Sequence, residues 1–320
     1  MEKYLALVES EIRKRKFGTQ PKSLYDPIKY IMSLGGKRLR PLLTMLSYAL
    51  YKDNVADIVR YAVAVEAFHN FTLMHDDIMD NAPLRRGKTT VHEKWNVNTA
   101  ILSGDVMLVK VYDMFLDLEQ NKMKEVLTLF NECASGVCEG QQWDMEFETR
   151  KKVTEAQYID MIRLKTAVLL GFSLELGAVL ADAPAADRKL LHEAGISLGI
   201  GFQLKDDLLD VYADKKKFGK QVGGDIIANK KTFLLIEALE KVKGADKKEL
   251  LYWLTAKKFD KKKKVMQVTA LYDKLGIHSL TEKRILEYFK RGFAGLQQLS
   301  VGAKAEGLAK FVGKLAERQK

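Results

Sequence analysis

The sequence predicts an all-α fold in which many helices pack into one large bundle. Apolar residues recur at steps of three and four along most of the 320-residue chain, and alternating patterns typical of strands are missing. Only five prolines occur, so few helix breaks are forced. The segment 159–180 is apolar on more than one side, which is typical of a helix inside a bundle rather than on its surface.

The predicted helices follow one another with short turns between them. The first sixteen residues already show helical spacing. The other periodic segments are, in chain order, 57–79, 99–118, 122–143, 155–181, 185–212, 230–242, 247–256, 261–275 and 281–299. Glycine or proline marks turns at 35–36, 83–87, 183–184, 219–225 and 276. None of these turns is long or polar enough to be an interdomain linker, so we predict a single domain over residues 1–320.

Composition excludes several classes of protein. The chain is 47% apolar, which argues against intrinsic disorder, and its two cysteines cannot build a disulfide framework. The longest apolar stretch, 166–182, is interrupted by Glu175, and the N-terminal segment lacks the apolar core of a signal peptide. We therefore predict a cytoplasmic protein with no stable membrane insertion.

The net charge of +11 raises the alternative of a nucleic-acid-binding bundle. Much of the excess lies in two lysine-rich runs, 215–217 and 257–264, which lack interleaved aromatic residues and are typical of solvated surfaces. The other basic residues lie beside acidic clusters, which favours phosphorylated small molecules as partners. We predict no nucleic-acid binding, and the role of the segment 257–264 is not explained by the sequence.

Two acidic clusters share one pattern near the end of an apolar helix. They are Asp76, Asp77 and Asp80 in the first, and Asp206, Asp207 and Asp210 in the second. Residues four apart lie about 5–6 Å from each other on one helix face, so each cluster directs two carboxylates at one place. Such like charges repel, and they persist best with a cation between them. Oxygen ligands alone favour Mg²⁺, which shares its shell with phosphate oxygens, so we predict a diphosphate substrate.

Basic turns adjoin these clusters. Residues 35–41 carry three cations after two glycines, residues 84–88 follow the first cluster, and 218–220 with 229–231 follow the second. Arginine binds phosphate oxygens as a two-pronged fork and lysine as a point charge. Metal-binding carboxylates beside phosphate-binding cations predict phosphate chemistry.

These stretches appear in a fixed order along the chain. They are GGKRLRP at 35–41, HDDIMDNAPLRRG at 75–87, Gly104-Asp105, Lys165-Thr166, GFQLKDDLLD at 201–210, Gly219-Lys220 and Gly224-Asp225. Together they resemble the trans-isoprenyl diphosphate synthases, the polyprenyl synthetase family. The resemblance implies the isoprenoid synthase fold, an all-helical bundle of about ten or more helices around a central cavity, as a homodimer with several Mg²⁺ ions. It implies a prenyltransferase that condenses isopentenyl diphosphate with an allylic diphosphate.

The same resemblance implies roles for individual residues. Direct Mg²⁺ ligands would be Asp76, Asp80 and Asp206. Asp77, Asp207 and Asp210 would complete the metal site by holding metal-bound waters or by contacting the groups around the metal. The allylic diphosphate would be bound by Arg85, Lys165, Lys220 and Lys230, and that of isopentenyl diphosphate by Lys37, Arg40, His69 and Arg86. Thr166 and Gln203 would lie beside the reacting carbons, where their oxygen dipoles can stabilise an allylic cation.

In this family, residues one turn before the first acidic cluster are implied to limit product length. Thr72 lies four residues before Asp76 on the same helix face. Phe71 directly precedes Thr72 and lies on the neighbouring part of the helix surface. An aromatic residue followed by a small one resembles the pattern for a twenty-carbon product, geranylgeranyl diphosphate. Fifteen-carbon farnesyl diphosphate is the alternative, because residues on neighbouring helices, such as Val106 and Cys133, can also shape the floor of the cavity.

Two further alternatives differ in their motifs. A class I terpene cyclase shares the bundle and one acidic cluster, but its second metal motif is typically of the Asn/Ser/Glu type, whereas the second cluster here is acidic. A non-catalytic subunit of a heteromeric prenyl synthase has usually lost one cluster or the basic turn, and all of them are intact here. The sequence therefore favours condensation.

Overall fold

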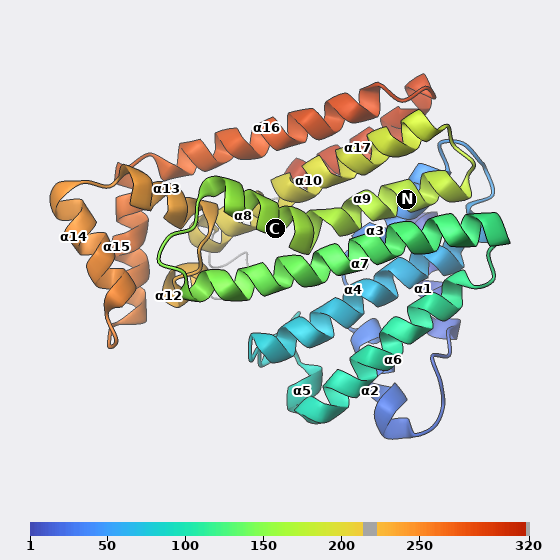
Figure 1. The fold of residues 1–320 in the computed structure, drawn as a ribbon, viewed down its shortest axis with the longest axis horizontal. Helices are drawn as coiled ribbons and strands as arrows, with labels where there is room; N and C mark the ends of the chain where they lie inside the picture. The colour runs from blue at the N-terminus through green and yellow to red at the C-terminus, as the bar shows by residue number, and fades with distance from the viewer. Residues whose placement is uncertain (214–222, 318–320) are drawn as a thin grey trace. The chain divides into compact units, whose positions relative to one another are not determined.

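The computed structural model describes residues 1–213 and 223–317, and within these ranges the regular structure is helical apart from one small hairpin (Figure 1). The predicted all-α fold is confirmed. The helices divide into two compact units, the first formed by residues 1–131 and 172–191 and the second by 132–171 and the residues from 192 onward. That the whole chain acts as a single domain stays a prediction.

The first unit is built around a long central helix. Helix α4 (Val59–Met79) packs against α1 (Glu2–Lys14), α2 (Lys22–Ser33), α3 (Leu39–Tyr48), α5 (Val91–Lys94) and α6 (Val97–Phe115). A 3₁₀ turn at Val55–Ile58 precedes α4, and a hairpin of β1 (Leu84–Arg85) and β2 (Lys88–Thr89) follows it. Figure 1 shows α4 and α6 running side by side.

Four buried phenylalanines form the core of this unit. The ring of Phe130 lies 5.0 Å from that of Phe68, 5.6 Å from Phe115 and 5.8 Å from Phe172, measured between centroids. Burying one such side chain contributes about 1.5–3 kcal/mol. Phe68 lies two turns before Asp76 on α4, so this aromatic cluster anchors the helix that carries the first acidic cluster.

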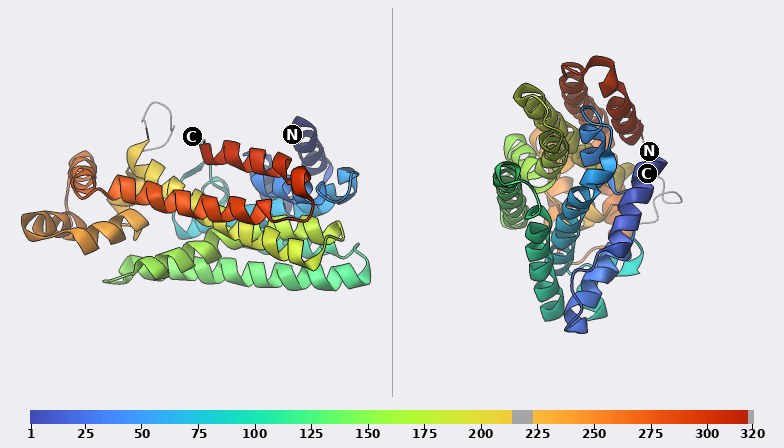
Figure 2. Two further views of the ribbon diagram at one scale, coloured as in Figure 1. Left: turned by 90° about the horizontal axis from the view of Figure 1, so that it is seen from above. Right: turned by 90° about the vertical axis from the view of Figure 1, so that its right-hand side faces the viewer.

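The second unit contains mostly C-terminal helices. They are α8 (Glu155–Ile162), α12 (Gly224–Ala228), α13 (Phe233–Lys241), α14 (Gly244–Thr255), α15 (Lys261–Lys274), α16 (Ile277–Gln297) and α17 (Glu306–Glu317), with a 3₁₀ turn at Gly302–Ala305. Helices α16 and α17 lie side by side (Figure 2). Three helices contribute residues to both units: α7 (Gln120–Thr149), α9 (Val168–Leu180) and α10 (Ala185–Tyr212). In the part of the chain that the structure describes, none of the helices has the length and apolar character needed to cross a membrane.

Two local features were not predicted. The helix predicted over 155–181 is divided into α8, a π-helical turn at Arg163–Ala167, and α9. A π turn adds one residue to the helix, and an apolar pattern of threes and fours does not reveal it. The hairpin was missed because its strands have only two residues each, too few to alternate. Its turn residues, Arg86 and Gly87, both have positive φ angles of 52° and 73°, as tight hairpins require.

The lysine-rich segment 257–264 has one buried member. The other lysines of the run are exposed, whereas Lys264, in the first turn of α15, has 0% of its surface exposed. Its Nζ donates hydrogen bonds to Asn229 Oδ1 (2.6 Å) and to the Ile227 carbonyl (3.2 Å), and burial lowers its pKa. Lys264 therefore caps the carboxyl end of α12, directly before Lys230.

Candidate functional site

The first acidic cluster has one buried aspartate and two more exposed ones. Asp77 is 2% exposed, and Arg85 on β1 binds it through Nε (2.8 Å to Oδ2) and a terminal nitrogen (2.7 Å to Oδ1). Asp76 is half-buried in the last turn of α4, and Asp80, the C-cap residue, is exposed. The inner carboxylate thus positions Arg85, while the outer two lie nearer the surface.

The second cluster repeats this arrangement. Asp207 is 6% exposed and accepts hydrogen bonds from the Tyr158 hydroxyl and from Gln203 Nε2, the latter at 3.0 Å. Asp206 is exposed, and Asp210 is half-buried. One Asp210 oxygen accepts the backbone N–H of Asp225 at 2.9 Å, which fixes the start of α12. In both clusters the middle aspartate is held by other side chains.

Carboxylates are crowded around the second cluster. Burial and the nearby Asp225 charge raise the pKa of Asp207 to about 8, and burial and Asp210 raise the pKa of Asp225 to about 6. A divalent cation bound here would relieve this repulsion. Sequence analysis placed Asp225 in a family motif but assigned it no role.

The donor set fits Mg²⁺ that is held together with a diphosphate. Among residues 1–213 and 223–317, no group of three or more His, Cys, Asp or Glu side chains is arranged to hold a metal ion by itself. Mg²⁺ takes much of its shell from water and phosphate, so the outer carboxylates Asp76, Asp80 and Asp206 suit it. The two clusters belong to different units, and their joint action on one diphosphate stays a prediction.

The first unit also gathers basic residues beside the turn before α3. The Arg86 guanidinium donates a hydrogen bond to the Gly35 carbonyl. It lies so close to Gly36 that a Cβ there would be 2.7 Å from it, and the φ of Gly36, 131°, also requires glycine. Burial and the charges of Arg40 and Arg86 lower the pKa of His69 well below its usual range, which favours the neutral imidazole.

Three of the residues predicted to bind isopentenyl diphosphate therefore influence one another electrostatically: the charges of Arg40 and Arg86 both lower the pKa of His69. The fourth, Lys37, is exposed and belongs to the same turn as Gly36. Neighbouring cations repel one another, and the attraction of each to a bound anion would offset this repulsion. This part of the first unit is suited to a phosphate group.

Two predicted allylic-diphosphate residues meet in the second unit. Lys165 Nζ lies 2.5 Å from Asp144 Oδ2, and Lys230 Nζ lies 3.9 Å from the same oxygen. Lys165 belongs to the π turn, and Gly140 of α7 allows that turn to approach, because a Cβ at Gly140 would lie 2.2 Å from the Lys165 nitrogen. Lys220 lies outside the described residues.

A hydrogen-bonded chain continues from the π turn to the second acidic cluster. Thr166 Oγ1 donates to Gln203 Oε1 at 3.1 Å, and Gln203 in turn donates to Asp207. The structure thus brings Thr166 and Gln203 together, and it adds Asp207 and Tyr158 to the same network. Their place beside the reacting carbons stays a prediction. This network fixes the orientation of the Gln203 amide, because its NH₂ group donates to Asp207 and its oxygen must then point the other way.

The predicted chain-length residues pack on α4. Phe71 is 8% exposed, and its ring lies 4.8 Å from that of His75 and 5.7 Å from that of Phe68. Thr72 Oγ1 donates to the His69 carbonyl at 2.8 Å. The role of Phe71 and Thr72 in limiting product length stays a prediction.

Sequence reasoning missed four residues that organise these groups: Arg38, Asp144, Tyr158 and Asp225. Each acts through a contact with a segment far away in the sequence, so spacing alone could not identify it. Arg38 and Asp225 both stand in motifs quoted from the sequence, but the burial of Arg38 and the contact of Asp225 with Asp210 are not visible there.

Comparisons with known proteins identify the family of the chain. The sequence model of the Polyprenyl synthetase family matches residues 21–272. The chain is 45% identical to a short chain isoprenyl diphosphate synthase of Methanocaldococcus jannaschii over 229 residues, which cover 71% of this chain and 70% of that protein. It is 41% identical to a geranylgeranyl diphosphate synthase of Methanosarcina mazei over 70% of this chain and 69% of that one. A crystal structure of a geranylgeranyl pyrophosphate synthase matches with a TM-score of 0.93 at 41% identity, covering 100% of this chain and 98% of the other.

Proposed function

Because the chain belongs to the polyprenyl synthetase family and is a prenyltransferase, we propose that it condenses isopentenyl diphosphate with an allylic diphosphate in the presence of Mg²⁺. We propose that its product is the twenty-carbon all-trans geranylgeranyl diphosphate. The observation that carries this proposal is the shared design of the two acidic clusters, in which a buried aspartate is fixed by the protein and the outer carboxylates are more exposed. The names of the relatives support the twenty-carbon product.

The proposal assigns the metal to the outer carboxylates. Asp76 and Asp80 in the first unit and Asp206 in the second would be the Mg²⁺ ligands, and Asp77, Asp207 and Asp210 would hold the surrounding groups in place. When bound, Mg²⁺ neutralises the negative charge of the leaving diphosphate. Arg85, Lys165, Lys220 and Lys230 would bind the same allylic diphosphate with their positive charges.

The reaction needs no nucleophile from the protein. The bond between the allylic carbon and oxygen breaks, and the electron pair leaves with the diphosphate. The double bond of isopentenyl diphosphate then forms the new carbon–carbon bond, and a proton is lost to the released diphosphate. The Thr166 and Gln203 oxygens would stabilise the positive charge that develops on carbon, since Gln203 Nε2 is already occupied by Asp207.

The second substrate would be held in the first unit. Lys37, Arg40, His69 and Arg86 would bind the diphosphate of isopentenyl diphosphate. A neutral His69 can donate one hydrogen bond to a phosphate oxygen, while the arginines supply the charge. The effect of the Arg40 and Arg86 charges on the pKa of His69 supports this assignment.

The direct test is a prenyl transfer assay with the purified protein. Isopentenyl diphosphate is supplied with dimethylallyl, geranyl or farnesyl diphosphate, and diphosphate release is followed with Mg²⁺ or with EDTA. We expect release that requires both substrates and Mg²⁺. Release from an allylic diphosphate alone would indicate a terpene cyclase, and no release with any primer would indicate a non-catalytic subunit.

Phe71→Ala is expected to lengthen the product with little loss of turnover, because removing the ring opens space one turn before the first acidic cluster. Chromatography of the dephosphorylated lipids measures the product. Phe293→Ala, which removes a half-buried phenylalanine of α16, is the control and is expected to keep the wild-type product. An unchanged product from Phe71→Ala would refute its role as the floor.

The native protein is expected to be a homodimer. Leu102, Val109 and Leu116, on α6 and its C-cap, are 58%, 57% and 56% exposed and recur every seven residues, so they form an apolar stripe on one helix face. We propose that a second copy covers this stripe. Light scattering should give twice the chain mass of 36.3 kDa. Val109→Asp is expected to give monomers, whereas Leu286→Asp, an equally exposed position on α16, should not; a monomeric wild type would contradict the proposal.

A further inference from the structure

Arg38 differs from the other cations of its turn in being buried. It is 2% exposed, whereas Lys37 is exposed and Arg40 is half-buried. Arg38 is the N-cap residue of α3, and its backbone adopts the left-handed conformation, with φ 46° and ψ 37°. An L-residue is disfavoured in this conformation, so other contacts must hold it there.

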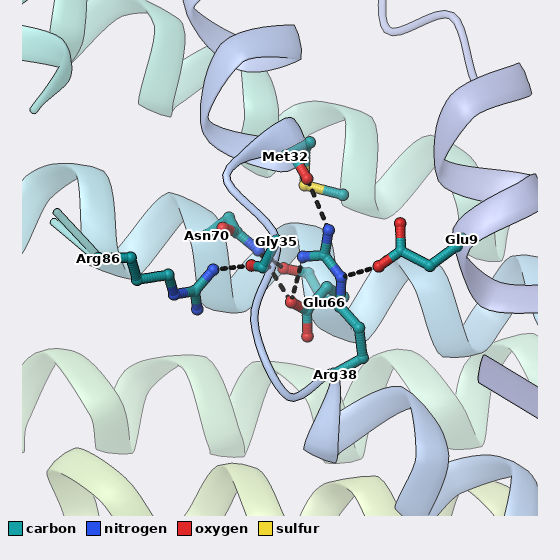
Figure 3. Close-up of polar contacts among 7 residues, drawn as sticks. All are labelled: Glu9, Met32, Gly35, Arg38, Glu66, Asn70 and Arg86. Atoms are coloured by element: carbon teal, nitrogen blue, oxygen red, sulfur yellow. Dashed lines mark hydrogen bonds and ion pairs between the residues drawn. The ribbon is translucent and has the colours of Figure 1, made fainter. Parts of the chain in front are cut away.

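Those contacts come from three helices (Figure 3). Arg38 Nε donates to Glu9 Oε1 of α1 at 2.8 Å, one terminal nitrogen donates to Glu66 Oε1 of α4 at 2.8 Å, and the other donates to the Met32 carbonyl of α2 at 2.7 Å. Asn70 Nδ2 donates to the Glu66 carbonyl at 2.8 Å and to Glu66 Oε1 at 3.3 Å, which fixes the partner carboxylate. The guanidinium is thus held in three directions at once.

The same turn is held from its other end by Arg86. Its guanidinium donates to the Gly35 carbonyl, and Figure 3 shows it approaching the turn from the side opposite to Glu9. Arg38 therefore fixes the end of this turn, at the start of α3. Arg86, which is predicted to bind a diphosphate, fixes its beginning at Gly35. Lys37 and Arg40 lie one and two residues from Arg38 in the sequence, so the position of the Arg38 backbone also sets the positions of theirs.

Arg38 also differs from the other basic residues of this turn in having its charge offset within the protein. Glu9 and Glu66 offset the Arg38 charge, and its fork is used within the protein, so Arg38 is poorly suited to bind an anion itself. Glu66 also lies one helical turn before His69, which places the Arg38 network and the predicted phosphate contact on the same face of α4.

We propose that Arg38 is a positioning residue that holds Lys37 and Arg40 in place for the diphosphate of isopentenyl diphosphate without touching it. This inference rests on the proposed function of that group. It separates the three cations of the motif into two that bind substrate and one that shapes the turn. A purely structural role would instead weaken the binding of both substrates or only the stability of the fold.

The test measures both substrates separately. Arg38→Met removes all three hydrogen-bond directions, and it is expected to raise KM for isopentenyl diphosphate about tenfold, a change of about 1.4 kcal/mol. KM for farnesyl diphosphate and kcat at saturation should stay near wild type. Arg150→Met, which removes an exposed arginine paired with Glu146, is the control and should change neither KM. Equal rises in both KM values, or no rise, would overturn the proposal.

Arg38→Lys keeps the test valid if Arg38→Met does not fold. Lysine keeps the charge between Glu9 and Glu66, but one ammonium cannot reproduce three fixed directions. Calorimetric titration with isopentenyl diphosphate alone should show weaker binding by Arg38→Lys. We expect the affinity to fall about threefold or more, which is the effect of losing one hydrogen bond. Wild-type affinity in this variant would overturn the inference. This binding measurement decides the inference even if the wild type catalyses no condensation, a result that would count against the proposed function instead.

Discussion

Asp76→Ala and Asp206→Ala are each expected to lower kcat by about 10³-fold or more, in line with the loss of electrostatic stabilisation at a reacting group. Each removes a carboxylate that we propose as a Mg²⁺ ligand, so the charge of the leaving diphosphate is less well neutralised. Activity should be measured over a wide range of Mg²⁺ concentrations. A higher Mg²⁺ requirement in the variants supports ligation by these residues.

The same substitutions should leave the fold nearly unchanged. Asp206 is exposed and Asp76 is half-buried, and surface substitutions usually shift stability by about 0.5 kcal/mol or less. Circular dichroism melting checks this expectation. Asp113→Ala, which removes an exposed aspartate paired with Lys110, is the control and should keep full activity. A collapse of the fold in both cluster variants would mean that these aspartates are structural.

Lys165→Met is expected to lower kcat/KM for the allylic substrate by about 10²–10³-fold, as when one donor to a developing anion is removed. Lys165 shares Asp144 with Lys230, so the change removes one cation and releases the carboxylate toward the other. KM for isopentenyl diphosphate should change little, because the residues proposed for that substrate belong to the first unit. Steady-state kinetics with each substrate varied in turn gives both values.

Two further variants complete this experiment. Lys152→Met removes an exposed lysine before α8 and should behave as wild type. Asp144→Asn keeps the side-chain shape but loses the charge that holds both lysines, and it is expected to reduce kcat/KM by about tenfold, or about 1.4 kcal/mol. An equal loss for both substrates in Lys165→Met would contradict its assignment to the allylic diphosphate.

The fold could be predicted from the sequence wherever apolar periodicity was long and uninterrupted. The predicted helix at 185–212 coincides with α10, because a proline precedes it and 28 residues keep one pattern. The π turn at Arg163–Ala167 was not predicted, although it carries Lys165 and Thr166. The spacing of apolar residues indicates that a segment is helical, but it does not indicate where one turn contains an extra residue.

The site could be predicted only in part for a similar reason. Motifs identified residues of the right chemistry, such as Asp77 and Arg85, and the structure shows that these two bind each other. Tyr158 and Asp144 were not predicted, because each meets its partner across a distance of many residues. Lys264 is the clearest case, since nothing in a run of lysines shows that the last one is buried.

The most direct test of the account is the mass of the lipid made from isopentenyl diphosphate and farnesyl diphosphate with Mg²⁺. After removal of the phosphates, mass spectrometry should find the twenty-carbon alcohol geranylgeraniol, and EDTA should abolish it. Recovery of farnesol with isopentenyl diphosphate unconsumed would contradict condensation to a twenty-carbon product, and a cyclic hydrocarbon formed from farnesyl diphosphate alone would contradict the prenyl transfer itself.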